Sequence, residues 1–306
     1  MSLSSLSPSA SLSPAGKRRS CLPQLSLWTA CASLLGLLAA PAHADATLDK
    51  IKQRGKLAVG VDGVGPPFGT LDPATGKLIG FQVDLARDIA KRLGVELEVV
   101  PVVASTRVQF LQAGKVDLLI ANIQWTKERN QILSFAPTPY NLVGGGAIVA
   151  RNSGIHKWED LRGKVACVSQ GSNFTKPLQE TYGAIVKGFR GIPESLLALK
   201  GGTCAASVHI YPAMRYTLSG ESAAQWKDYT LATTEQLIPS PTVIWLRRGE
   251  TDTQALVDKT IQEWHRSGSL LALALKYGVP EEYILSASQR AQQGKFDHAP
   301  FESDLK

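Results

Sequence analysis

The sequence predicts an α/β protein built on mostly parallel sheets with helices on both faces. Short apolar runs alternate with segments whose apolar residues follow a helical period, and repeated strand-helix units of this kind build such sheets. The run at 116–123 is too apolar for a strand at an exposed surface, as expected of a strand buried on both faces. A glycine-rich segment at 140–152 and a proline-broken one at 238–249 interrupt the alternation, which suggests two crossings between two lobes.

The first lobe is expected to alternate regularly between strand and helix. Strands are predicted over 56–62, 95–102 and 116–123, and helices over 80–94 and 106–114. The helix over 80–94 carries an apolar residue at every fourth position and ends at a glycine, Gly94, which commonly stops helices.

The second lobe continues the same pattern. Strands are predicted over 164–170, 184–189 and 203–209, the last ending on His209 before a Tyr-Pro break, with helices from about Asn173 and over 193–202. The predicted lobes comprise 45–141 with 242–306, and 142–241. The segment 253–278 is expected to be helical and the tail after about Ser286 to be loose. Ligands of α/β folds bind at the carboxyl ends of the strands, here in the cleft between the lobes.

Residues 1–44 read as a secretory signal peptide. A basic cluster at 17–19 precedes an apolar stretch at about 25–38 and the small-residue pattern Ala42-His43-Ala44. A membrane anchor is disfavoured because the apolar stretch falls short of the roughly 20 residues that span a bilayer. We expect cleavage near Ala44 and a mature protein in the periplasm; Arg18-Arg19 only loosely resembles a twin-arginine signal.

Removal of the leader changes the charge and cysteine counts. It takes away three basic residues and no acidic ones, which lowers the formal charge from +7 to +4, too mild an excess to indicate nucleic-acid binding. Cys167 and Cys204 remain, an even pair in an oxidising compartment. One disulfide is favoured, and two buried free thiols are the alternative.

Polar side chains follow the buried strand at 116–123. Thr126 can cap a short helix from which Arg129 would project toward the strand ends, where its guanidinium can hold a carboxylate through two parallel hydrogen bonds. Asn122 and Gln124 would line the approach. The alternative is an ordinary solvated arginine at a helix end.

The second lobe carries a matching feature. The chain runs from a strand through Gly171 into Ser172 and Asn173 at a predicted helix start, where free N–H groups and polar side chains suit an anion. Such a pair is most often only a cap, but both features would face one cleft.

Other chemistries lack a signature. The sequence contains no HExxH, paired CxxC, GxSxG or phosphate-loop pattern, and its histidines are scattered. We therefore expect no metal and no cofactor.

Five segments in order carry a family resemblance. They are "LAVGVDGVGPPF", "GKLIGFQVDLARDIAKRLGV", "TRVQFLQAGKVDLLIANIQWTKERNQILSFAPTPY", "DLRGKVACVSQGS" and "LKGGTCAASVH". In this order they resemble the extracytoplasmic solute-binding proteins of family 3, the polar amino acid type. The resemblance implies a type II periplasmic-binding-protein fold, two lobes with a two-strand hinge that close on the ligand. It also implies a monomer that delivers its solute to an ABC transporter permease in the inner membrane.

The resemblance assigns roles to the cleft residues. Arg129 falls at the position that pairs with the ligand's α-carboxylate, and Ser172 and Asn173 fall where the second lobe completes this contact. Asp62 begins the loop beside the ligand side chain, and Arg107 lies on the wall of the same pocket. Further contacts from the first lobe are implied for Asn122, Gln124 and Thr126.

Three positions depart from the family pattern. Gly65 replaces a common stacking aromatic, so that wall is open or supplied by Phe68, Phe110 or Trp125. Cys204 replaces the Asp of a "GxxDA" motif. His209 replaces the Asp that usually holds the ligand's α-ammonium, unless the register slips there and it is an ordinary strand-end histidine.

The sequence thus predicts the periplasmic solute-binding component of an ABC importer, binding an amino acid or a related small carboxylate by hinge closure. Because a neutral histidine only accepts or donates one hydrogen bond and a protonated one repels an ammonium, His209 favours an anionic ligand without a free α-amine. The alternative is an enzyme on the same fold, similar to cyclohexadienyl dehydratase, with His209 as acid or base and Asp62 as the second titratable group.

Overall fold

The computed structural model describes residues 45–63, 65–219 and 223–301. The described residues belong to one compact unit. The predicted signal peptide lies outside the described residues. None of the described helices is long and apolar enough to cross a bilayer.

The first sheet has the strand order β4-β1-β5-β13-β6. Strand β1 (Lys56–Asp62) lies between β4 (Glu96–Val102) and β5 (Leu118–Ile120) and runs parallel to both, as predicted. Two short antiparallel strands, β13 (Trp245–Leu246) and β6 (Ser134–Phe135), complete it. A small hairpin of β2 (Thr70–Leu71) and β3 (Leu78–Ile79) lies apart from this sheet.

The part of the molecule built around this sheet is called the first half, and the part built around the second sheet is called the second half. The first half includes the helices α1 (Ala46–Arg54), α2 (Phe81–Leu93), α3 (Arg107–Gln112) and α4 (Lys127–Ile132). The helix α2 ends as the sequence predicts, because Gly94 adopts a left-handed φ of 68° and donates its N–H to the last carbonyls. Its apolar face is fully buried in the core above β1. The agreement follows from a period and a stop signal that are both local.

The second sheet has the order β11-β7-β10-β8-β9, with β12 also paired to β7. Its strands are β7 (Asn141–Ala150), β8 (Val165–Ser169), β9 (Ile185–Phe189), β10 (Ala206–Ile210), β11 (Tyr229–Leu231) and β12 (Leu237–Thr242). The helices α5 (Thr175–Glu180), α6 (Ile192–Lys200) and α7 (Tyr211–Ser219) accompany it, with short 3-10 turns at Trp158–Leu161 and Ala223–Trp226. Two sheets with flanking helices confirm the predicted α/β class, but both sheets are mixed rather than mostly parallel, because β7 and β13 pair antiparallel with their neighbours.

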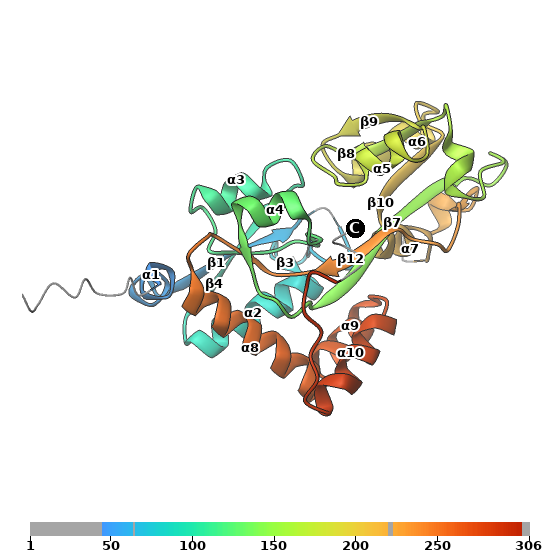
Figure 1. Ribbon diagram of the computed structural model, residues 1–306. Coiled ribbons are helices and arrows are strands. Elements are labelled where there is room, and N and C mark those ends of the chain that lie inside the picture. Colours follow the sequence, from blue (N-terminus) through green and yellow to red (C-terminus); the bar gives the residue numbers. More distant parts are fainter. Residues whose placement is uncertain (1–44, 64, 220–222, 302–306) are drawn as a thin grey trace, which may run out of the picture. The chain divides into compact units, whose positions relative to one another are not determined.

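The chain passes between the sheets twice, after β6 and before β13, and the antiparallel strands β7 and β12 lie side by side there (Figure 1). Within the glycine-rich segment at 140–152, residues Asn141–Ala150 form one continuous strand, β7. A Cβ on Gly144 would lie 2.6 Å from the Cβ of Gln236, so glycine permits the close approach of the returning chain. The lobe boundaries at 141/142 and 241/242 stay a prediction.

The C-terminal segment forms α8 (Thr251–Ser267), α9 (Ser269–Tyr277) and α10 (Glu282–Gln292). The expectation of a loose tail after Ser286 is wrong for α10. Ile284, Ala287, Ser288 and Ala291 are buried at helical spacing. Small residues give a weak apolar signal, and only their packing against neighbouring helices reveals this face.

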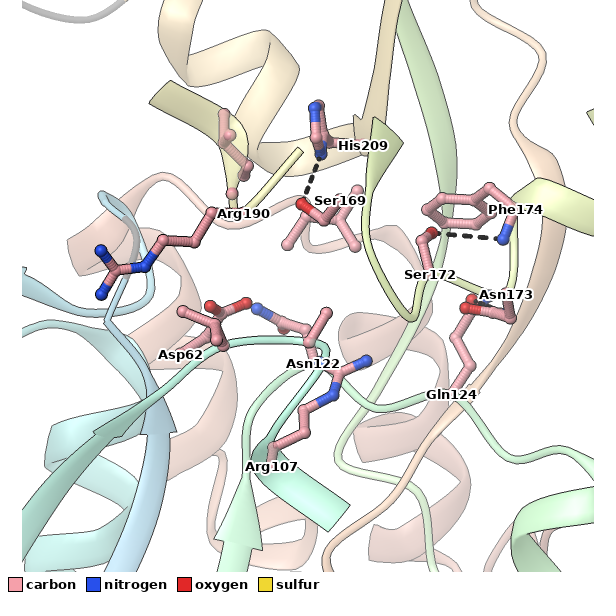
Figure 2. A pocket seen from close by; sticks show the side chains of 15 residues that line it. Asp62, Arg107, Asn122, Gln124, Ser169, Ser172, Asn173, Phe174, Arg190 and His209 are labelled. Carbon is pink, nitrogen blue, oxygen red and sulfur yellow. Dashed lines mark hydrogen bonds between the residues drawn. The ribbon is translucent and has the colours of Figure 1, made fainter. Parts of the chain in front are cut away.

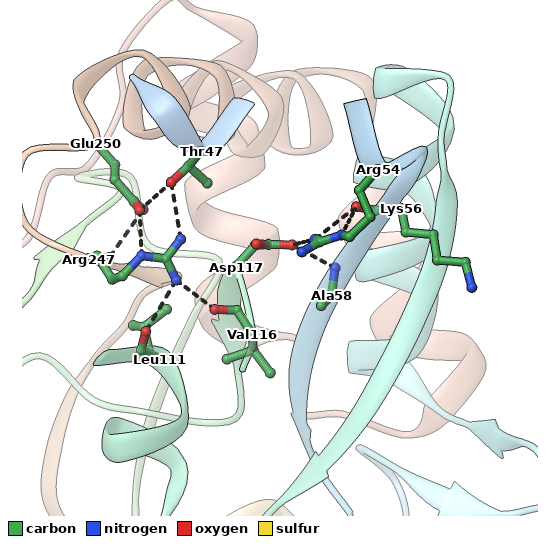
Figure 3. Close-up of polar contacts among 9 residues, drawn as sticks. All are labelled: Thr47, Arg54, Lys56, Ala58, Leu111, Val116, Asp117, Arg247 and Glu250. Carbon is green, nitrogen blue, oxygen red and sulfur yellow. Dashed lines mark hydrogen bonds and ion pairs between the residues drawn. The ribbon is translucent and has the colours of Figure 1, made fainter. Parts of the chain in front are cut away.

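Polar contacts hold helix α1 and the start of the C-terminal helix α8 against the first sheet (Figure 3). The Arg247 guanidinium donates to the Val116 carbonyl over 2.7 Å and pairs with Glu250, which also accepts from the Thr47 hydroxyl. Asp117 pairs with Arg54 and accepts the N–H of Ala58 over 2.8 Å. The first helix and the start of α8 are thereby tied to the strands that lead to the cleft.

A disulfide joins Cys167 on β8 to Cys204, whose Cα atoms lie 5.8 Å apart. Cys204 stands two residues before β10, and β8 and β10 are parallel neighbours. The bond therefore joins the adjacent strands that carry Ser169 and His209 to the cleft.

Candidate functional site

A cleft lies where residues from both sheets meet. From the first half it is lined by Asp62, Arg107, Asn122 and Gln124, and from the second by Ser169, Ser172, Asn173, Phe174, Arg190 and His209. Figure 2 shows the two groups facing each other, with Asp62, Asn122 and Arg107 opposite Ser169 and His209. Each parallel strand delivers its carboxyl end to this edge, as α/β topology requires.

Arg107 is the first residue of α3 and is buried. Its Nη1 donates to the Ala121 carbonyl over 2.7 Å, which anchors the side chain beside Asn122 (Figure 2). Burial lowers the pKa of Arg107, and the nearby Asp62 carboxylate opposes that effect. An arginine pKa is so high that the guanidinium keeps its charge, so the cleft holds a buried cation.

Asn122 has an unusual backbone and an unsatisfied side chain. Its φ is 50°, in the left-handed region that asparagine tolerates better than most residues. The side chain is buried, and neither its amide nitrogen nor its oxygen has a hydrogen-bond partner among the described residues. Since buried amides are normally paired, these atoms are available to a ligand in the cleft.

Gln124 links the two halves of the cleft. Its Nε2 donates to the carbonyls of Val143 (2.6 Å) and Ile238 (2.9 Å), and its Oε1 accepts from the Asn173 amide over 2.6 Å. The residue predicted to line the approach therefore also ties the two crossing strands to the turn after β8.

Thr126 and Arg129 do not line the cleft. Thr126 caps α4, as predicted, because its hydroxyl accepts the N–H of Arg129 over 3.3 Å. The half-buried Arg129 donates its Nη1 to the Gln124 carbonyl over 2.9 Å. Burial, and then the neighbouring Arg107 charge, lower the pKa of Arg129 to about 9. The two guanidiniums thus lie within electrostatic range of each other.

Ser172 and Asn173 line the cleft from a turn rather than from a helix start. Helix α5 begins at Thr175, later than expected. The Ser172 hydroxyl accepts the N–H of Phe174 over 3.2 Å, so the turn is closed by its own side chain. The helix begins two residues after the predicted start near Asn173, because the Ser172 side chain closes a turn there in place of a helix cap.

His209 lies on β10, opposite Gly146 of β7, with 4% of its surface exposed. Its Nδ1 lies 3.2 Å from the Ser169 hydroxyl, and its Nε2 has no hydrogen-bond partner among the described residues. Burial lowers the pKa of His209 to about 3, so the imidazole is neutral near pH 7. This point of the cleft wall therefore carries neither the positive charge of an imidazolium nor the negative charge of a carboxylate.

The aromatic wall is supplied from an unexpected place. Phe68 is in the first core, 2% exposed and edge-on to Phe81 at 6.3 Å, so its expected ligand contact is wrong. Phe110 and Trp125 pack in another core cluster, whereas Phe174 of the second half lines the cleft. Apolar residues near a cleft carry no sequence mark of which side they face.

Several further lining residues were not predicted from the sequence, among them Ser169, Phe174 and Arg190. Ser169 is the last residue of β8, Arg190 directly follows β9, and Phe174 follows the turn after β8. Ser169 and Arg190 could have been found from the sequence only by their position at the carboxyl end of a parallel strand, the same position that indicated Ser172 and His209. Among the described residues, no group of three or more His, Cys, Asp or Glu could hold a metal ion.

The buried neutral His209 makes stability depend on pH. Its pKa is about 3 in the folded protein and about 6.5 unfolded, so the unfolded state binds the proton first as pH falls. We expect the free energy of unfolding to drop by about 2 kcal/mol from this residue between pH 7 and pH 5. Urea unfolding at both pH values would measure it. The variant His209→Gln should lose this part of the slope, while His265, present in both proteins, cancels; an unchanged slope would contradict the assignment.

Comparisons with known proteins identify the family. Residues 57–280 match the family described as bacterial extracellular solute-binding proteins, family 3. The chain is 32% identical over 234 residues to the L-cystine-binding protein TcyJ of Escherichia coli K12, covering 75% of this chain and 85% of that one. A mutant of the Thermotoga maritima protein ArgBP is similar in structure, with a TM-score of 0.69 and 30% identity, covering 76% of this chain and all (100%) of that one.

A third similar structure is the ancestral amino acid-binding protein AncCDT-1, described as a precursor of cyclohexadienyl dehydratase. It has a TM-score of 0.67 and 26% identity and covers 76% of this chain and 99% of that one. With its two sheets, its paired crossing strands and its cleft of residues from both halves, the chain belongs to the bacterial extracellular solute-binding proteins of family 3.

Proposed function

We propose that the protein captures a small carboxylate-bearing solute, an amino acid or a close relative, and presents it to an ABC importer permease in the inner membrane. In this proposal it acts as a periplasmic monomer after cleavage of its signal peptide near Ala44. The observation that supports it most is the cleft itself, which joins a buried cation, Arg107, to polar groups of both sheets. The relatives named cystine-, glutamine- and arginine-binding proteins support a solute of this size.

The ligand's carboxylate would lie on the Arg129 side of the cleft. Arg129 carries a lowered pKa partly because Arg107 is nearby, so an anion beside Arg129 would offset that repulsion. The Asn122 amide, buried and unpartnered among the described residues, can donate to the same carboxylate. Ser172 and Asn173 would complete the contact from the opposite wall.

Binding would operate by closure. Contacts from both walls form only when the two halves approach, so the ligand stabilises the closed arrangement and shifts the population toward it. The paired strands β7 and β12 would be present in both the open and the closed arrangement. The hydrogen bond between Asn173 and Gln124 would form on closure.

A catalytic role has less support. Asp62 and His209 both line the cleft, but His209 is neutral and its Nδ1 is engaged with Ser169. The named relatives are binding proteins, and the dehydratase enters only as the descendant of one similar ancestral binding protein. Binding without bond chemistry is therefore the function proposed.

The carboxylate contact is tested by Arg129→Ala. A thermal-shift screen with L-amino acids and aliphatic dicarboxylates first selects the best ligand, and calorimetry then measures its affinity. We expect Arg129→Ala to weaken binding about 100-fold, because charge-assisted hydrogen bonds contribute about 1.5–3 kcal/mol. The control Arg215→Ala removes an exposed arginine on α7 and should bind normally. Unchanged affinity in a folded Arg129→Ala protein would refute this role.

A further inference from the structure

The charges around the cleft are unequal. The charged side chains that line it are Asp62, Arg107 and Arg190, and Arg129 lies within electrostatic range of Arg107. His209 contributes no charge because it is neutral. Among the described lining residues, two guanidiniums therefore face one carboxylate, with Arg129 close behind Arg107, and the cleft has an excess of positive charge.

The single carboxylate is already engaged. Asp62 and Arg107 lie close enough for the carboxylate to favour the charged guanidinium, and both line the cleft from the same wall (Figure 2). A ligand cation placed at Asp62 would meet the repulsion of Arg107. The cleft is thus poorly suited to a ligand with net positive charge.

The opposite wall adds neutral groups. Ser169, Ser172, Asn173 and His209 carry hydroxyl, amide and imidazole groups, and the Asn122 amide joins them from the first wall. Hydroxyl and amide groups can donate hydrogen bonds to carboxylate oxygens. No carboxylate of the described residues on that wall lines the cleft to hold a ligand ammonium.

We propose that the ligand is a small dicarboxylate, with one acid group held on the Arg129 side by Ser172 and Asn173, as in the proposed function, and the second paired with Arg107. This inference rests on the proposed function, since it assumes that the cleft binds a carboxylate. Two anionic groups would offset the excess of guanidiniums at the site. Arg107 is suited to the second group because its position is fixed by the hydrogen bond to Ala121, so little side-chain freedom is lost on binding.

The test compares two ligands that differ in one charge. L-glutamate and L-glutamine have nearly the same size, but the distal group is a carboxylate in one and an amide in the other. Calorimetry on the mature natural protein should give at least 30-fold tighter binding of L-glutamate or of glutarate than of L-glutamine. Equal or tighter binding of L-glutamine or L-arginine would overturn the dicarboxylate proposal and leave the proposed function standing. Binding of no carboxylate at all would overturn both.

Arg107→Gln assigns the selection to its residue. In this variant we expect the ratio of the L-glutamine and L-glutamate dissociation constants to fall to within about threefold of one, whereas Arg215→Gln on the exposed face of α7 should keep the natural ratio. A folded Arg107→Gln protein that keeps the ratio would remove Arg107 from the proposal. If the variant does not fold, the comparison of ligands in the natural protein still decides whether a dicarboxylate is preferred.

Discussion

Substitution of Gly171 by alanine should abolish tight ligand binding, with an expected loss of affinity of 100-fold or more. Gly171 stands in the turn after β8, and a Cβ there would lie 2.9 Å from the Ala104 carbonyl oxygen and 3.1 Å from the Ser105 Cα. Both contacts are with backbone of the other half of the cleft, which cannot rotate away. The added methyl group should therefore hold the two walls apart and prevent the contacts that closure requires.

A second glycine provides a matched control. Gly163 has a φ of +70°, close to the +78° of Gly171, but a Cβ there would meet nothing within 4 Å. Both alanine variants should lose about 1–2 kcal/mol of stability, because a side chain is strained in the left-handed region. Only Gly171→Ala should lose affinity in calorimetry. Equal affinity in the two variants would show that this contact is not needed for binding.

His209→Asp should change the preference of the cleft toward ligands that carry an α-amine. An aspartate at this position places a carboxylate on a wall where the described lining residues offer none, and its hydrogen bond to an ammonium is worth about 1.5–3 kcal/mol. We expect the affinity for L-glutamate relative to glutarate to rise about 10- to 100-fold over the ratio in the natural protein. Calorimetry with the two acids measures this directly.

The neutral variant His209→Asn is the control for shape. It removes the imidazole without adding a charge, so its ratio of L-glutamate to glutarate affinity should stay within about threefold of the natural one. The aspartate variant should also be less stable without ligand, because an unpaired buried carboxylate is costly. If the natural protein binds L-glutamate more than 100-fold more tightly than glutarate, this refutes the hypothesis that His209 indicates a ligand that needs no α-amine.

Much of the first half could be predicted because its signals are local. The helix over 81–93 has an apolar residue at every turn and a glycine in a left-handed stop, and β1 and β4 each contain two or more valines, which favour strands. The Tyr-Pro sequence after His209 was expected to end the strand, and in the structure it also begins helix α7. Proline is accepted in the first helical turn, so the same residue signals an end or a beginning.

Site residues were harder to predict than elements. Phe68 and Phe174 are both aromatic and both lie near loops, but packing on Phe81 takes the first into the core while the turn after β8 places the second in the cleft. Arg129 was expected at the ligand; its side chain donates to the Gln124 carbonyl and does not line the cleft, so its ligand contact stays a prediction. Which face a side chain takes depends on neighbours that arrive from elsewhere in the chain.

The sequence by itself determined the α/β class, the order of strands and helices, the family resemblance and the position of Asp62, Asn122 and His209 at strand ends, because periodicity and stop signals act over a few residues. Only the tertiary structure decided that His209 is buried, neutral and bonded to Ser169, which lies 40 residues away. It also decided that Arg107 lies within the electrostatic range of both Asp62 and Arg129. Burial and charge balance are sums over segments distant in sequence, and the fold alone brings those segments together.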